Sequence, residues 1–310
     1  MLARFRDENA TAISGFNVSD ALLVPEVGVT GSNRFHQIRL QDGRQLGWSE
    51  FGVRHGFPIL YMHREGSCRL EAEFFDRFAR AAGFRLIAAD RPGIGASDYA
   101  AMESSLQISR DYVQLIQHLG LRRFGVLSWG GGSAFALPLA ALEQTRCAFV
   151  ALLSPVDQPC SMTSNRVLRT LFTLGLGALV NVRRIWSGRD LGRYFQRWRE
   201  QLNGVERRYS DDERVRLLLA DISDEALRQG AAGLAQDLWL AAGSSKAAEH
   251  DLQIPVHVWS ARHPEIERVD HRNSMLVHHV MRRQNQLIAG YVASQLFEVL
   301  RAEQRRLCQP

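Results

Sequence analysis

Lysine is almost absent from this sequence of 310 residues. Lys246 is the only lysine among 38 basic residues, so the other 37 are arginine. Arginine suits the recognition of carboxylates and phosphates, but a biased base composition of the gene explains the same ratio. The net charge of +5 and the pI near 9.3 indicate only weakly that partners of this chain are acidic.

Long hydrophobic runs are also missing. The longest candidate, Leu171 to Val182, contains glycine and asparagine and is shorter than the roughly 20 apolar residues of a membrane-spanning helix. The start of the chain has no apolar stretch typical of a signal peptide, and we interpret residues 1–33 as an N-terminal extension. These absences favour a cytoplasmic protein without a membrane span.

Cysteine is sparse and its four positions are far apart. They are Cys68, Cys147, Cys160 and Cys308. Without a C-x-x-C pair, neither a zinc site nor a redox dithiol is indicated, and free thiols fit a cytoplasmic location.

The histidines give no stronger metal signal. Four of them are close in sequence, namely His263, His271, His278 and His279. His271 and His278 are seven residues apart, so they would share a helix face without being near each other, and we interpret the four as surface residues of a helical region. We therefore expect no metal and no cofactor.

Short apolar runs alternate with amphipathic segments along most of the chain, which predicts an α/β fold with a doubly wound, mostly parallel sheet. Strands are expected at residues 34–40, 44–51, 58–62, 84–89, 124–129, 149–153, 254–259 and 287–291. Helices are expected at residues 70–82, 104–119, 131–142 and 269–283, and from the last strand to Arg306.

Residues 159–249 break this alternation and read as a mostly helical insertion between two parts of the core, residues 34–158 and 250–310. Arginines interleave with aromatic residues in this insertion, a pattern that nucleic-acid-binding segments also show. However, Tyr194 and Trp198 are four residues apart, as are Arg189, Arg193 and Arg197. That spacing is typical of an amphipathic helix with one solvated basic face, so we expect no nucleic-acid partner.

The most informative run is Phe124 to Ser133, which contains Ser128-Trp129-Gly130-Gly131-Gly132. It resembles the nucleophile elbow of the α/β-hydrolase superfamily, where a strand, a sharp turn and a helix carry G-x-S-x-G. Residues 90–98 resemble the D-R-P-G-x-G-x-S turn of the same superfamily, and residues 225–230 and 237–240 look like the end of a cap in its esterase-like and epoxide-hydrolase-like branch. The resemblance extends from Arg34 onward and implies an α/β-hydrolase core with a helical cap.

The resemblance also implies a catalytic triad that this sequence lacks. The reactive serine of the elbow is replaced by Gly130, and the acid position after the strand ending at Trp259 corresponds to Pro264 or Glu265. The histidine of the triad follows the last strand in the superfamily, but this chain has no histidine after His279. A non-glycine nucleophile is held there in a strained backbone conformation that glycine adopts almost freely, so Gly130 is consistent with an elbow released from catalysis.

The expected ligand site is the turn itself. His63 ends a strand where the superfamily has a His-Gly pair, and Arg64 replaces that glycine. The backbone N–H of Gly131 is expected to remain a donor at a helix N-terminus. Ligand-binding residues are predicted to be His63, Arg64, Trp129, Gly130 and Gly131.

Three other residues near the turn could supply a nucleophile. Ser128 fits half of G-x-S-x-G, but Val126 then stands where the crowded turn needs a small residue. Cys68 is near His63 in sequence and offers a displaced Cys/His pair, although a packing thiol is the simpler reading. Ser133 is expected inside the helix as a hydrogen-bonded hydroxyl.

Two functional hypotheses remain open. In the favoured hypothesis the chain is a non-hydrolytic homologue that binds a small acyl or carbonyl ligand. Its partner could instead be another protein or a second copy of this chain in a homodimer. In the alternative it is a hydrolase or a lyase- or isomerase-like enzyme that uses non-standard residues. The candidates for that chemistry are His63, Arg64, Glu65, Ser128, His263 and Glu265.

Overall fold

The computed structural model describes residues 34–155, 170–172, 174–178, 211–243, 252–260, 276–280 and 290–307. The predicted N-terminal extension, residues 179–210 of the predicted insertion, and the candidates Glu265, His263 and His271 lie outside these residues. None of the helices in the described ranges combines the length and the hydropathy that a membrane span requires.

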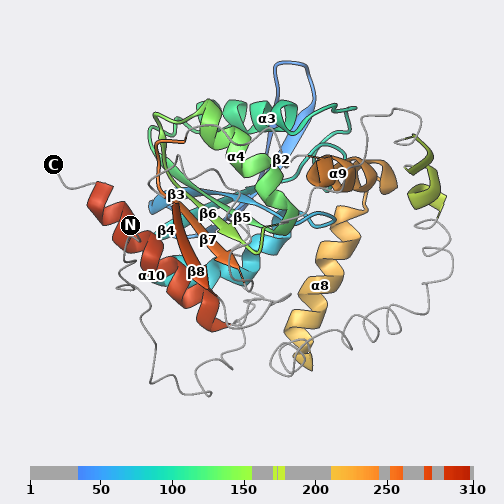
Figure 1. The fold of residues 1–310 in the computed structure, drawn as a ribbon. Helices are drawn as coiled ribbons and strands as arrows, with labels where there is room; N and C mark the ends of the chain where they lie inside the picture. The colour runs from blue at the N-terminus through green and yellow to red at the C-terminus, as the bar shows by residue number, and fades with distance from the viewer. Residues whose placement is uncertain are drawn as a thin grey trace, which may run out of the picture.

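One eight-stranded sheet occupies the centre of the molecule (Figure 1). Its strands are β1 (Arg34–Arg39), β2 (Gln45–Gly52), β3 (Phe57–Met62), β4 (Phe84–Ala89), β5 (Phe124–Trp129), β6 (Cys147–Leu153), β7 (Val256–Ser260) and β8 (Leu276–Val280). The spatial order is β1-β2-β4-β3-β5-β6-β7-β8, with β2 antiparallel to both of its neighbours and all other pairs parallel. The chain therefore reverses its winding direction beside β3, and ligands of such sheets bind at the carboxyl ends of strands near that reversal.

Helices cover both faces of the sheet, as the continuous apolar runs of β3 to β6 require. They are η1 (Arg69–Phe75), α2 (Asp76–Ala82), α3 (Ser105–His118), η2 (Gly130–Gly132), α4 (Ser133–Leu142), α8 (Glu213–Ala226), α9 (Ala231–Gly243) and α10 (Gly290–Leu307). One buried cluster joins the sheet to α3 and α4, and a second joins its other face to η1, α2, α8 and α10. Figure 1 shows α3 and α4 on one side of the sheet and α10 on the other.

Local signals in the sequence set several of these boundaries. The hairpin between β1 and β2 turns at Asp42 and Gly43, where Arg44 N donates to Asp42 Oδ1 at 3.1 Å. Helix α3 begins after Ser104, which forms a capping box with Gln107, and the chain leaves it through Gly120. The predicted helix over residues 70–82 is divided into the 3₁₀ segment η1 and the α-helix α2.

The prediction was wrong near the C-terminus. A helix was expected over residues 269–283, but residues 276–280 form β8, and the expected strand at residues 287–291 overlaps the start of α10. His278 and His279 are therefore on a strand and not on a helix. The physical reason is that β8 pairs in parallel with β7 and completes its backbone hydrogen bonds, whereas a short apolar run alone does not distinguish a strand from a helix.

Candidate ligand site at the β5 turn

The turn after β5 places three consecutive glycines at the carboxyl end of the strand. Gly130 has φ +54, a left-handed conformation that side-chain-bearing residues rarely adopt. A Cβ atom added to Gly130 would lie 3.0 Å from Glu65 Oε2 and 3.2 Å from Arg64 Cγ. The space above this turn is thus occupied by side chains of the loop that follows β3.

Glu65 binds the backbone of the turn directly. The Gly131 N–H donates a hydrogen bond of 2.6 Å to Glu65 Oε2. This N–H lies at the start of the helical segment formed by η2 and α4, where free N–H groups and the helix dipole favour an anion. The donor predicted at Gly131 is present, and a carboxylate of the same chain is bound to it.

Arg64, the residue before Glu65, lies over the ring of Trp129 at the end of β5. Its guanidinium carbon is 4.1 Å from the centroid of the Trp129 ring, and its Nε donates to Glu71 Oε1 at 2.7 Å. Glu71 is fully buried and also accepts from the Arg64 backbone N–H and from the Tyr61 hydroxyl, both at 2.8 Å. Burial and the charge of Glu71 raise the pKa of Tyr61 well above its ordinary value, so Tyr61 remains a hydrogen-bond donor to Glu71.

His63 is fully buried beneath this loop. Its Nδ1 is 2.8 Å from the carbonyl oxygen of Arg64 and 2.9 Å from Nη2 of Arg91. Burial, followed by the charge of Arg91, lowers the pKa of His63 well below its ordinary value, and the imidazole is therefore neutral at neutral pH. Its Nε2 has no hydrogen-bond partner among the described residues.

Arg91 joins the loop after β3 to helix α9. Its guanidinium binds Asp237 of α9 through Nε at 2.5 Å and through Nη2 at 2.8 Å, and it also donates to the carbonyl oxygens of His63 and Arg64. Asp237 Oδ2 accepts a further bond from the Gly66 N–H at 3.2 Å. The loop that holds Glu65 is consequently fixed both by Arg91, which follows β4, and by Asp237 of α9.

A second buried connection runs parallel to the first. Arg69 Nη1 donates to Asp90 Oδ2 at 2.6 Å and to Glu225 Oε1 of α8 at 2.5 Å. Gln229 continues this contact by donating to the carbonyl oxygens of Gly95 and Ser97. The segments that resemble the D-R-P-G turn and the cap end are thus in direct contact, which the sequence reasoning did not predict.

The remaining candidates lie elsewhere or are engaged in packing. Ser128 lies inside β5, paired in register with Met62, and its buried Oγ has no hydrogen-bond partner within the described ranges. Cys68 is buried with its Sγ 3.6 Å from the carbonyl oxygen of Ile222, and burial raises the pKa of its thiol well above the ordinary value. Ser133 is the first residue of α4 and is buried. None of these observations gives a thiolate or an activated hydroxyl.

His279 belongs to a stack of aromatic rings on β7 and β8. Its ring centroid is 4.3 Å from that of Trp259, and its Nε2 is 3.2 Å from Nδ1 of His257. In the part of the chain that the structure describes, no group of three or more His, Cys, Asp or Glu side chains is placed to hold a metal ion.

Comparison with known proteins identifies the family. The alpha/beta hydrolase fold family matches residues 55–264, and this chain belongs to it. No curated protein matches the sequence.

Solved structures share the fold at low sequence identity. The enol-lactonase from Burkholderia xenovorans LB400 is 16% identical with a TM-score of 0.64, covering 87% of this chain and 100% of the lactonase. A mutant of a putative epoxide hydrolase from Pseudomonas aeruginosa is 18% identical with a TM-score of 0.63, covering 90% and 98%. A thermophilic esterase from Thermogutta terrifontis is 17% identical with a TM-score of 0.63, covering 89% and 100%.

Proposed function

We propose that this chain does not hydrolyse its ligand through a Ser-His-acid triad, and that it binds a small molecule with an acyl, carboxylate or carbonyl group at the β5 turn. The ligand's polar head would accept a hydrogen bond from the Gly131 N–H. Residues 159–249 would act as the cap of this site and residues 1–33 as an extension of the core. We also propose that the protein is cytoplasmic and that it binds a partner protein or a second copy of this chain.

The observation that carries this proposal is the hydrogen bond between Gly131 and Glu65. A 2.6 Å bond to a carboxylate means that the N–H is aimed and polarised for an oxygen anion. Glu65 is partly exposed and comes from a loop, so a ligand oxygen that replaces its Oε2 would meet a donor already in position. The family uses the same turn to stabilise an oxyanion, and in this chain the residue at the nucleophile's position beside the donor is Gly130, which has no side chain.

The missing catalytic groups support the non-hydrolytic half of the proposal. Gly130 offers no side chain, and no histidine follows β8 in the sequence. His63 is neutral, buried and bound through Nδ1. Activation of a hydroxyl needs a base within hydrogen-bond reach and an acid that orients it, and the described residues at the turn do not supply that sequence of contacts.

The shape of the site limits the ligand. A Cβ atom added to Gly131 would lie 3.0 Å from Cβ of Ala241, so α9 approaches the turn closely. Next to this contact on α9, Trp239 packs against Phe172 with ring centroids 5.8 Å apart. A ligand with a small polar head and a compact apolar body fits these neighbours better than an extended one.

A second candidate function follows from the position of the Glu65 carboxylate. Its Oε2 lies within 3.0 Å of the place where a nucleophile's Cβ would be. In a lyase- or isomerase-like enzyme, this carboxylate would accept a proton from a carbon next to the ligand's carbonyl group, while Gly131 stabilises the resulting enolate oxygen. In that reading Glu65 is the base, and Arg64 balances the negative charge.

Labelling and hydrolysis test the absence of the triad. Purified protein is expected to remain unlabelled by a fluorophosphonate probe and to hydrolyse short p-nitrophenyl esters only at the background rate. Labelling that disappears in Ser128→Ala would contradict the proposal. Ester turnover that persists in Ser128→Ala but disappears in Glu65→Gln would also contradict the proposal, because it would show hydrolysis that depends on a residue outside the usual triad.

Calorimetric titration tests the binding half. Phenylacetate and acetophenone serve as carboxylate and carbonyl probes, with Glu65→Ala compared against Glu298→Ala, which removes an exposed carboxylate on α10. Because Glu65 competes for the Gly131 donor, its removal should tighten binding of the carboxylate probe by about tenfold. Equal affinities in the two variants, or no binding in either, would refute the assignment of Gly131 as the ligand's donor.

A further inference from the structure

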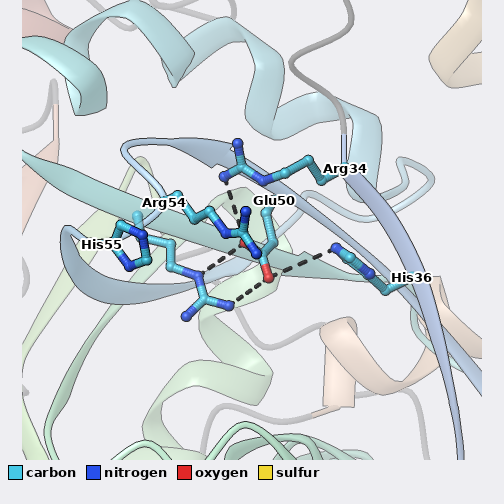
Figure 2. A pocket seen from close by; sticks show the side chains of 6 residues that line it. Arg34, His36, Glu50, Arg54 and His55 are labelled. Atoms are coloured by element: carbon cyan, nitrogen blue, oxygen red, sulfur yellow. Dashed lines mark hydrogen bonds and ion pairs between the residues drawn. The ribbon is translucent and has the colours of Figure 1, made fainter.

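Positively charged side chains surround a pocket at the opposite end of the sheet. The pocket has a volume of about 270 Å³ and is lined by Arg34, His36, Glu50, Arg54, His55 and Arg85; we call it the cationic pocket. Figure 2 shows Glu50 in the middle, with Arg34 and His36 reaching toward it from one strand and Arg54 and His55 close by. It lies at the amino ends of β3 and β4, whereas the β5 turn is at the carboxyl end of its strand.

The register of the sheet explains why these side chains meet. Arg34 is paired with Glu50 across β1 and β2, and Arg85 is paired with Gly52 across β2 and β4. Alternate residues share a face, so Arg34 and His36 lie on the same face as Ile38, and Arg85 on the same face as Ile87. Ile38 and Ile87 are packed in the cluster under α3, and the charged residues continue that face beyond the cover of the helix.

Glu50 balances only part of the positive charge. Its carboxylate is bound by Arg85 at 2.5 and 3.0 Å and by Arg34 at 3.5 Å, with His36 Nε2 at 3.9 Å. Burial would raise the pKa of Glu50, but the hydrogen bond and charge of Arg85 lower it below its ordinary value, so Glu50 is ionised. Three guanidinium groups therefore face one carboxylate, a surplus of two positive charges among these four groups.

Protection of an exposed sheet edge explains charged residues on β1 by itself, but it does not explain two other features. Arg54 and His55 come from the turn after β2 and not from the edge strand. Furthermore, the Nε of Arg34 is buried and has no hydrogen-bond partner among the described residues. A buried guanidinium N–H without an acceptor is costly, and an anion in the pocket would supply the acceptor.

We propose that the cationic pocket binds a doubly charged oxyanion, namely inorganic phosphate or the phosphate group of a small ester. Two surplus charges match a phosphate dianion, and arginine forks are suited to pairs of phosphate oxygens. The pocket is too small for a large ligand, so the phosphate group itself would make most of the contacts. The site is independent of the β5 turn and would remain even if the function proposed there failed.

Titration calorimetry tests this site with three probes, namely inorganic phosphate, phenyl phosphate and acetate. The three are compared at the same ionic strength, and the phosphate titration is then repeated at increasing sodium chloride concentrations. Phosphate is expected to bind with a stoichiometry of one and to weaken as sodium chloride is added, because exposed charge pairs are screened. Acetate is expected to bind much more weakly. Phenyl phosphate binding more tightly than phosphate would identify an ester as the natural ligand, and the reverse would identify the free ion.

Two variants in the pocket and one control variant locate the binding. Arg54→Gln should weaken phosphate binding by about tenfold, the effect of losing one charge-assisted contact, whereas Arg122→Gln removes an exposed arginine elsewhere and should have no effect. Glu50→Gln should tighten binding because it removes the competing carboxylate. Equal weakening in Arg54→Gln and Arg122→Gln, weaker binding in a folded Glu50→Gln variant, or no saturable binding to the wild type would overturn the proposal.

Discussion

Near the carboxyl ends of β3 and β4, Arg69 and Arg91 are buried and bound to acids of α8 and α9, whereas at the amino ends of β3 and β4 arginines line an open pocket. The side chains of Arg91 and Asp237 are only 1% and 2% exposed, while those of Arg34 and His36 are 31% and 43% exposed. A buried pair that loses one member leaves a charge without water or counter-ion. An exposed charge is compensated by solvent and stays available to a ligand, so the same residue type serves architecture at one end and recognition at the other.

The largest expected effect comes from breaking a buried pair. Asp237→Ala should lower the free energy of unfolding by about 3–5 kcal/mol, because Arg91 would remain buried without its partner. Urea denaturation measures the change, with the same dependence of the unfolding free energy on urea concentration fitted to all variants. Arg80→Ala is the control, since it removes a half-exposed partner of Asp76 and should change stability by less than about 0.5 kcal/mol. Similar losses of unfolding free energy in both variants would contradict the distinction between buried and exposed arginines.

The β5 turn gives the next largest effect. Gly130→Ser should destabilise the fold by about 1–3 kcal/mol through its positive φ. It should not create esterase activity, because no histidine follows β8 in the sequence to activate the new hydroxyl. Gly120→Ser is a matched control, as Gly120 also has a positive φ but no atoms within 4 Å of an added Cβ. We expect a larger loss of unfolding free energy in Gly130→Ser than in Gly120→Ser. If that difference becomes smaller when Glu65→Ala is added to Gly130→Ser, the decrease measures the contact with Glu65. Robust ester hydrolysis by Gly130→Ser would reveal a base that the proposal lacks.

Like charges on η1, α2 and α8 give a smaller, pH-dependent effect on stability. Burial, followed by the charges of Asp76 and Asp221, raises the pKa of Glu73 from 4.5 to about 7. Because the folded protein binds this proton more tightly, the contribution to stability is complete below the ordinary pKa and is lost as the pH rises through about 7. Glu73→Gln should stabilise the protein at pH 8 by about 1 kcal/mol after allowance for solvent screening, and should have little effect at pH 4. The same gain at both pH values would contradict this assignment.

The smallest stability change is expected in the cationic pocket. Arg54 is exposed and forms no ion pair with the described residues, so Arg54→Gln should alter the unfolding free energy by less than about 0.5 kcal/mol. Thermal and urea unfolding without phosphate provide the measurement. A loss comparable to that of Asp237→Ala would mean that this end of the sheet is held together by its charges as well, and the contrast between the two ends would disappear.

Sequence patterns predicted the elements whose signals are local. The residue bounds of β4 and β5 were predicted correctly, and the hairpin at Asp42 and Gly43 was placed where it occurs. These elements carry their own turn residues and capping groups. β8 was missed because a segment of five residues that includes two histidines is too short to show a period. Whether it forms a strand or a helix depends on its pairing with the edge of β7.

The site was predicted only in part, for a related reason. The sequence identified Gly130, Gly131, Arg64 and Trp129, which the structure brings together. It gave no signal that Glu65 bonds to Gly131, since the two are 66 residues apart and meet because β3 and β5 are neighbours in the sheet. The bond between Arg91 and Asp237 spans 146 residues, and the choice among many possible acids depends on packing that no local pattern records.

Helix α9, part of the proposed cap, meets the turn after β4 at a place where two backbones are in contact. A Cβ atom on Gly233 of α9 would overlap the carbonyl group of Gly93, and one on Gly93 would approach Gly233 to within 2.9 Å. A chimeric protein that takes its cap from another member of the family will therefore dock here only if the donor also has glycine at the matching helix position. Libraries that exchange caps to search for new ligands should keep Gly93 and Gly233 constant and vary the rest of α9.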